Sequence, residues 1–192
     1  MENQSGRRLK HLHGDRGGEF LNNLLLQHLR SKGVRYTFSN PDSPQQNGVA
    51  EARNKASGRI ITALLRQSEA PMSLWPYAAQ HATLLNNHYP HGLLNGKTPF
   101  EVWHGRAPSM ARLKVWGCTG HVLLNKDQRR RSGGKLGPVT KPCVLLGLNP
   151  LGPGWLLLDT SCNREIYSSD VVFEEDIPFY MRRADRAEEP PL

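Results

Sequence analysis

The chain has 192 residues, 38% hydrophobic and 22% charged, which is a globular composition without the long apolar run of a transmembrane helix or the apolar segment of a secretory signal. Its formal net charge of +8 at pH 7 favours polyanionic partners, nucleic acid before an anionic membrane. The three cysteines (Cys118, Cys143 and Cys162) form neither a disulfide framework nor a CxxC metal motif, so a reducing intracellular compartment is expected.

The first 48 residues predict two strands around a helix. Residues 8–13 alternate weakly and predict a strand that ends at Gly14. Apolar positions after Gly18 have helical spacing, and this helix is expected to stop at Lys32 and Gly33. Residues 34–38 predict a second strand, and the Pro-, Asn- and Gly-containing segment 39–48 predicts a loop.

The middle of the chain predicts helices. A long helix is expected over 49–68, with one face made of Val49, Ala52, Ala56, Ile60 and Ala63, and an opposite face that carries Glu51, Lys55, Arg59 and Thr62. Another helix is expected over 75–87. Residues 88–112 are rich in Gly, Pro and His and predict a linker with a short helix near Phe100.

From residue 113 onward, short β-prone runs alternate with turns, which predicts a small barrel or curled sheet. The expected strands are 113–116, 121–124, 143–148, 155–158, 165–167 and 171–173. The charged last dozen residues are expected to be disordered. Segment 101–141 carries nine basic and two acidic residues, and the run Arg129, Arg130 and Arg131 is interpreted either as a solvated loop or as a nucleic-acid contact.

Two carboxylates are placed to do chemistry. Asp15 follows the first predicted strand, and Glu51 opens the long helix. Carboxylates at a strand end and a helix start can converge on Mg²⁺, and two metals held in this way support phosphodiester transfer. The alternative is that Asp15 is a turn residue and that Glu51 complements the helix N-terminus.

The motifs around these carboxylates closely resemble those of copia-type LTR retrotransposon integrases. Residues 15–20 (D-R-G-G-E-F) match the family's D-x-G-G-E-F, and residues 44–51 (P-Q-Q-N-G-V-A-E) match its P-Q-Q-N-G-x-A-E. The 35 residues between Asp15 and Glu51 are the family's spacing. Further similar motifs lie at 98–108, 113–118, 143–148 and 169–175, so the resemblance covers about residues 7–178.

This resemblance implies an α/β followed by all-β fold. The implied parts are a partial RNase H-like integrase core over 1–90, a linker with a short helix over 91–112, an SH3-like β domain over 113–178 and a disordered tail over 179–192. The implied activity is DNA integration by Mg²⁺- or Mn²⁺-dependent strand transfer. The partner is DNA, a homo-oligomer is left open, no membrane is involved, and the location is nuclear if the chain functions.

The resemblance also implies roles for individual residues. Asp15 and Glu51 become catalytic metal ligands. Gln46 and Asn47 belong to the loop that approaches DNA at the active site. Lys55 and Arg59, one and two turns after Glu51, are placed to meet phosphates. The charge count, and not the resemblance, adds Arg129, Arg130 and Arg131 as candidate nucleic-acid contacts.

The sequence also departs from the family pattern. The family uses three catalytic carboxylates, and only Glu2 is acidic before Asp15. The first catalytic aspartate, the first strands of the core and the zinc-binding His-His-Cys-Cys region are therefore expected to be missing, which would leave the chain inactive alone. The alternatives are a non-catalytic nucleic-acid-binding protein and a fragment that does not fold.

His11 and His13 form the remaining cluster. They lie two residues apart on a predicted strand and share one face, where they resemble a pair of metal ligands. The favoured interpretation is that they lie beside an open sheet edge.

Overall fold

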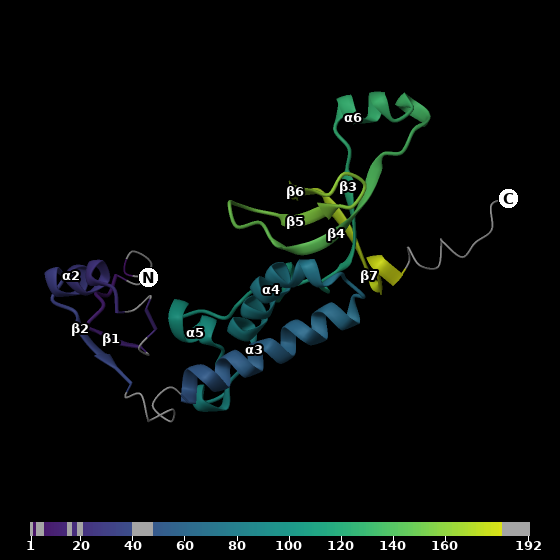
Figure 1. Cartoon of the computed structure of the whole chain (residues 1–192). Coiled ribbons are helices and arrows are strands. Elements are labelled where there is room, and N and C mark those ends of the chain that lie inside the picture. The colour runs from purple at the N-terminus through teal and green to yellow at the C-terminus, as the bar shows by residue number, and fades with distance from the viewer. Residues whose placement is uncertain (1, 3–5, 15–16, 19–20, 40–47, 182–192) are drawn as a thin grey trace. The chain divides into compact units, whose positions relative to one another are not determined.

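The structure is a computed structural model that describes residues 2, 6–14, 17–18, 21–39 and 48–181. It divides into two compact units, Met1–Ala56 and Ser57–Leu192, and each unit is described by itself (Figure 1). This division differs from the predicted one, which placed the first boundary near residue 90. Within the described ranges, no helix combines the length and the apolar character needed to cross a membrane.

The first unit contains a β-α-β segment made of β1 (His11–Gly14), α2 (Asn23–Ser31) and β2 (Arg35–Phe38). The two strands pair in parallel, with His11 opposite Arg35 and Gly14 opposite Phe38. The Asn22 side chain caps α2 by accepting a 2.7 Å hydrogen bond from the backbone N–H of Leu25. All three elements are those predicted from the sequence, with shorter bounds.

Helix α3 (Gly48–Gln67) is the predicted long helix, but its buried side is not the predicted one. Ala52, Ala56 and Ala63 of the expected apolar face are exposed. Leu65 is buried instead, and Ile61 and Leu64 are half-buried against the same core. The larger side chains of the C-terminal half therefore determine which side of the helix packs inward, because they remove more apolar area from water than alanines do.

Four short or medium helical elements follow α3. They are η2 (Met72–Leu74), α4 (Trp75–His88), η3 (Gly92–Leu94) and α5 (Pro99–His104), and a final turn, η4 (Met110–Arg112), leads into the sheet. Thr98 and Glu101 form a capping box at the start of α5: the Thr98 hydroxyl accepts from the Glu101 N–H, and the Glu101 carboxylate accepts from the Thr98 N–H. The predicted short helix near Phe100 is thus present.

A five-stranded antiparallel sheet makes up the rest of the second unit. Its strands are β3 (Cys118–Leu123), β4 (Thr140–Leu148), β5 (Trp155–Asp159), β6 (Arg164–Ser168) and β7 (Val171–Pro178), in the order β6-β5-β4-β3-β7. The expected strand at 113–116 is absent: Leu113 follows the η4 turn, and the chain turns again at Gly117, where φ is +79°. The fold class predicted from the sequence, α/β followed by an all-β part, is confirmed.

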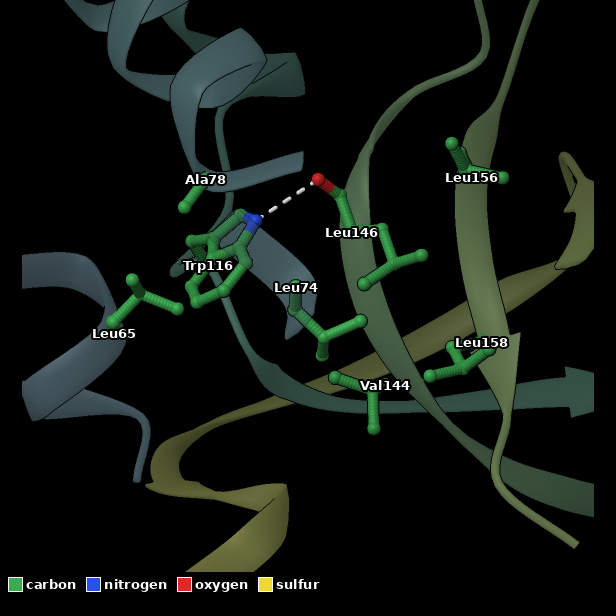
Figure 2. Packing of buried hydrophobic residues seen from close by; sticks show 8 residues of the cluster. All are labelled: Leu65, Leu74, Ala78, Trp116, Val144, Leu146, Leu156 and Leu158. Carbon is green, nitrogen blue, oxygen red and sulfur yellow. Dashed lines mark hydrogen bonds between the residues drawn. The ribbon is translucent and has the colours of Figure 1, made fainter. Parts of the chain in front are cut away.

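The main core joins helices to this sheet around Trp116 (Figure 2). Trp116 is 3% exposed and packs with helical residues on one side and strand residues on the other. The cluster consists of Leu65, Leu74, Ala78, Trp116, Val144, Leu146, Leu156 and Leu158. The Trp116 indole N–H donates a 2.9 Å hydrogen bond to the Leu146 carbonyl, so the ring's one polar group is satisfied inside the core.

An insertion occupies the connection between β3 and β4. It contains helix α6 (Lys126–Arg131) and the turn η5 (Gly134–Leu136), which pack chiefly against each other. Figure 1 shows α6 beyond the ends of β3 and β4, away from the other strands of the sheet. The run Arg129, Arg130 and Arg131, for which a solvated loop and a nucleic-acid contact were both open interpretations, is therefore part of a helix.

Candidate nucleic-acid interface

One of the two predicted catalytic residues, Asp15, lies outside the described part of the chain, and so do the predicted DNA-contacting residues Gln46 and Asn47. Glu51 is described and lies exposed in the first turn of α3. Among the residues that the structure describes, no three His, Cys, Asp or Glu side chains gather into a possible metal site. The described residues alone therefore do not form the implied Mg²⁺ site, and we derive no catalytic step from them.

Lys55 and Arg59 follow Glu51 along α3 at intervals of four residues, and both are exposed. Side chains four residues apart lie on the same side of a helix. Glu51, Lys55 and Arg59 therefore form one exposed polar row, as the sequence predicted. The row offers two cations to a ligand that approaches this side of α3.

The nine basic residues of segment 101–141 fall into two groups. The first group is engaged in contacts within the fold. Arg106 stacks over the Phe100 ring at 5.4 Å, Arg112 donates to the Gly154 carbonyl at 3.3 Å, Lys114 pairs with Glu175 at 2.9 Å, and Lys141 pairs with Asp159. Carboxylates compensate the charges of Lys114 and Lys141, whereas Arg106 and Arg112 make a ring contact and a hydrogen bond to a carbonyl.

The pair of Lys141 and Asp159 shows how this charge is neutralised. Asp159 is buried at the end of β5, and burial on its own raises the pKa of a carboxyl group. Hydrogen bonds from Lys141, Ser161 and Cys162 outweigh that effect and hold the pKa of Asp159 well below its usual range. The same contact raises the pKa of Lys141, so both groups stay charged near neutral pH.

The second group comprises the five cations of the α6 insertion. In the described part of the chain, no side-chain hydrogen bond or ion pair engages them, and all are exposed or half-exposed. They are Lys126, Arg129, Arg130, Arg131 and Lys135. Five cations without a side-chain partner, against the single carboxylate of Asp127, make this short insertion suited to phosphate oxygens.

Local hydrogen bonds keep these cations on a helix. The Asn125 side chain accepts from the Gln128 N–H at 2.8 Å, and the Gln128 side chain accepts from the Asn125 N–H at 2.9 Å. Asp127 in the first turn and the three arginines in the last turn also match the helix dipole. The Asn125 and Gln128 spacing is a capping-box signal in the sequence, which could have indicated a helix here.

Comparison with protein families places part of this region in a known domain type. Residues 118–186 match the family described as the retroviral polymerase SH3-like domain. The match covers strands β3 to β7 together with the α6 insertion, so the five cations lie within the matched domain.

Longer matches are found to transposon proteins of plants. The chain is 35% identical over 175 residues to the retrovirus-related Pol polyprotein from transposon TNT 1-94 of Nicotiana tabacum, which covers 91% of this chain and 13% of that protein. It is 31% identical over 175 residues to the corresponding polyprotein from transposon RE2 of Arabidopsis thaliana, covering 91% and 12% respectively. The chain thus spans about one eighth of the length of these relatives.

Among solved structures, one similar chain comes from the simian T-cell lymphotropic virus intasome in complex with PP2A regulatory subunit B56 gamma. It is 16% identical, with a TM-score of 0.45, and the match covers 90% of this chain and 60% of that one.

Proposed function

We propose that this chain binds DNA during integration. The premise is that it belongs with the retrovirus-related Pol polyproteins of transposons and carries the retroviral polymerase SH3-like domain. The resemblance predicted from the sequence motifs is confirmed at this level. In our proposal, the α6 insertion of the SH3-like domain binds the phosphate backbone of DNA.

The observation that carries this proposal is the division of the basic residues into two groups. Lys114 and Lys141 are paired with carboxylates inside the fold, whereas the cations of α6 and η5 have no such partner in the described part of the chain. When unpaired cations bind DNA phosphates, they displace the counterions that are condensed on the DNA. The release of these counterions is the main source of sequence-independent affinity for DNA.

We further propose that the larger polyprotein uses this segment in strand transfer. Asp15 and Glu51 are the residues that would hold Mg²⁺, which would supply a polarised nucleophile and stabilise the leaving oxygen. The exposed position of Glu51 in the first turn of α3 is compatible with that role. Lys55 and Arg59 would contact the DNA backbone beside it, and the loop residues Gln46 and Asn47 would approach the reacting strand.

A salt titration of DNA binding tests the proposal. If five phosphates are neutralised, log K should fall with log[salt] at a slope of roughly −4.5. The triple variant Arg129→Gln, Arg130→Gln and Arg131→Gln should bind labelled duplex more weakly, with a slope reduced by about 2.7.

A variant with the same change in net charge provides the control. Lys32, Lys97 and Arg164 are exposed and lie on three different elements or turns, so their joint replacement by Gln lowers the total charge equally. This control should keep nearly the full slope. Equal losses in the two triple variants would mean that overall charge, and not α6, binds DNA, and a flat salt response of the unaltered chain would remove the proposal altogether.

A further inference from the structure

Two histidines of strand β1 converge on one threonine of strand β2. His11 Nε2 and His13 Nδ1 each lie 2.9 Å from the same atom, the hydroxyl oxygen of Thr37. The two imidazole nitrogens are therefore no more than twice that distance apart. His13 is the direct neighbour of Thr37 in the parallel pairing, and His11 is two residues away on the same strand.

Strand geometry fixes this convergence. Side chains at positions i and i+2 point to the same face of a sheet. His11, His13 and Thr37 are all exposed, while the intervening Leu12 is half-buried on the opposite face. The pair is thus built into the register of β1 and β2, and it opens to solvent.

The Thr37 hydroxyl satisfies only part of the hydrogen-bonding capacity of the two imidazole rings. Thr37 has a single hydroxyl proton, so it donates to at most one imidazole and accepts from the other. Neutral imidazole is a preferred ligand of Zn²⁺, Ni²⁺ and Cu²⁺, whereas Mg²⁺ prefers oxygen. Two imidazole nitrogens that already face a common point form the nitrogen half of a transition-metal site.

We propose that His11 and His13 chelate a first-row transition-metal dication on the open face of β1. Metal–nitrogen bonds of about 2.1 Å require the rings to turn slightly toward each other, and their exposure leaves them room to do so. The Thr37 hydroxyl orients the rings before metal arrives and becomes an outer-shell partner afterwards. This site is separate from the Mg²⁺ site implied for Asp15 and Glu51, and it does not depend on the proposed DNA binding.

The residues around His11 and His13 limit the affinity for a metal ion and determine which further ligands it would take. In the described part of the chain, no third His, Cys, Asp or Glu joins the pair. Arg35 lies opposite His11 in the register, so a positive residue lies beside the site. This charge weakens binding of a bare dication and favours an anion or hydroxide in the remaining coordination positions.

Nickel binding to the full chain tests the site. Ni²⁺ serves as the probe because it binds imidazole without redox chemistry, and the exposed thiol of Cys162 is removed by using a Cys162→Ser background. Isothermal titration should show one Ni²⁺ per chain, with no heat from Mg²⁺ at the same concentrations. His11→Ala and His13→Ala should each weaken binding at least about tenfold, and Thr37→Val should weaken it by up to about tenfold.

His28→Ala is the matched control, because His28 is an exposed histidine of the same unit without a histidine partner on its face of α2. It should leave the Ni²⁺ affinity unchanged. Paramagnetic broadening in the background chain adds a readout that needs no further substitution: the imidazole signals assigned to His11 and His13 should broaden first. Binding that survives both histidine substitutions, or that falls equally with His28→Ala, would overturn the proposal, as would the absence of binding.

Discussion

Replacement of Trp116 should uncouple the helices of the second unit from its sheet. Trp116 is 3% exposed, and it belongs to one buried cluster with Leu65, Leu74 and Ala78 of the helical part and with residues of β4 and β5. Trp116→Ala removes the whole ring and its hydrogen bond, and a change of this type in a core typically destabilises by about 3–5 kcal/mol. That loss is a large share of the total stability of a domain of this size.

The smaller change Trp116→Phe separates the hydrogen bond from the packing. Phenylalanine keeps most of the apolar contact but leaves the buried Leu146 carbonyl without its indole donor. An unsatisfied buried acceptor costs about 1–3 kcal/mol, so Trp116→Phe should lie between Trp116→Ala and the unaltered chain.

Urea unfolding followed by far-UV circular dichroism measures these differences without relying on tryptophan fluorescence. Trp75→Ala is the control, because Trp75 is 56% exposed, and it should change the free energy of unfolding by less than about 1 kcal/mol. Equal effects of Trp75→Ala and Trp116→Ala would refute the reasoning. So would a transition in which the strands of the Trp116→Ala variant keep their full stability.

Three further predictions follow from the site and its surroundings. Asp159→Asn should flatten the decrease in stability at acid pH. The folded-state pKa of Asp159 is depressed, so its contribution to the free energy of unfolding is present above the unfolded pKa of about 4 and is lost as pH falls below it. Thermal melts from pH 6 to 2.5 that match those of the unaltered chain would contradict this. Asn125→Ala should remove about 1 kcal/mol from helix α6 and weaken DNA binding, while global unfolding shifts by less than about 0.5 kcal/mol; an unchanged DNA affinity would argue against an ordered α6 as the contact. The 192-residue chain alone should not join an element-end duplex with Mg²⁺ or Mn²⁺, because the implied reaction needs three carboxylates and only Asp15 and Glu51 match; joining that both Asp15→Asn and Glu51→Gln abolish would show that another group completes the site.

Elements with strong internal patterns were predictable from the sequence. The helices α3 and α4 and the strands β4 to β7 lie within a few residues of the positions predicted. These segments have clear periodicity or β-branched and apolar runs bounded by turn residues. The buried side of α3 was not predictable in this way, because it depends on where Trp116 and the strands come to lie.

The prediction of a strand at 113–116 was wrong for a similar reason, namely contacts with distant parts of the chain. Its residues alternate like a strand, but Trp116 enters the core immediately before the left-handed turn at Gly117. At that glycine, an added Cβ would lie 2.5 Å from the Cβ of Ser68, so the close approach of this residue, which directly follows α3, enforces glycine here. Such long-range contacts are invisible to a local pattern.

The candidate interface was predictable only as a region. Charge counting identified segment 101–141, but it could not separate the cations bound within the fold from those left free. The partners that neutralise Lys114 and Lys141 are Glu175 and Asp159, which lie 61 and 18 residues further along the chain. Asp15, Gln46 and Asn47 remain predictions, since they lie outside the described residues.

The position of α6 in the β3–β4 connection has an evolutionary consequence. Because the insertion packs mainly on its own turn η5, a mutation there changes the charge presented to a partner with little effect on the sheet. If α6 binds DNA as proposed, natural selection can adjust the strength of that binding, by gain or loss of single arginines or by a change in loop length, while the domain keeps folding. Transposons that spread in different hosts are expected to diverge faster at this insertion than around Trp116.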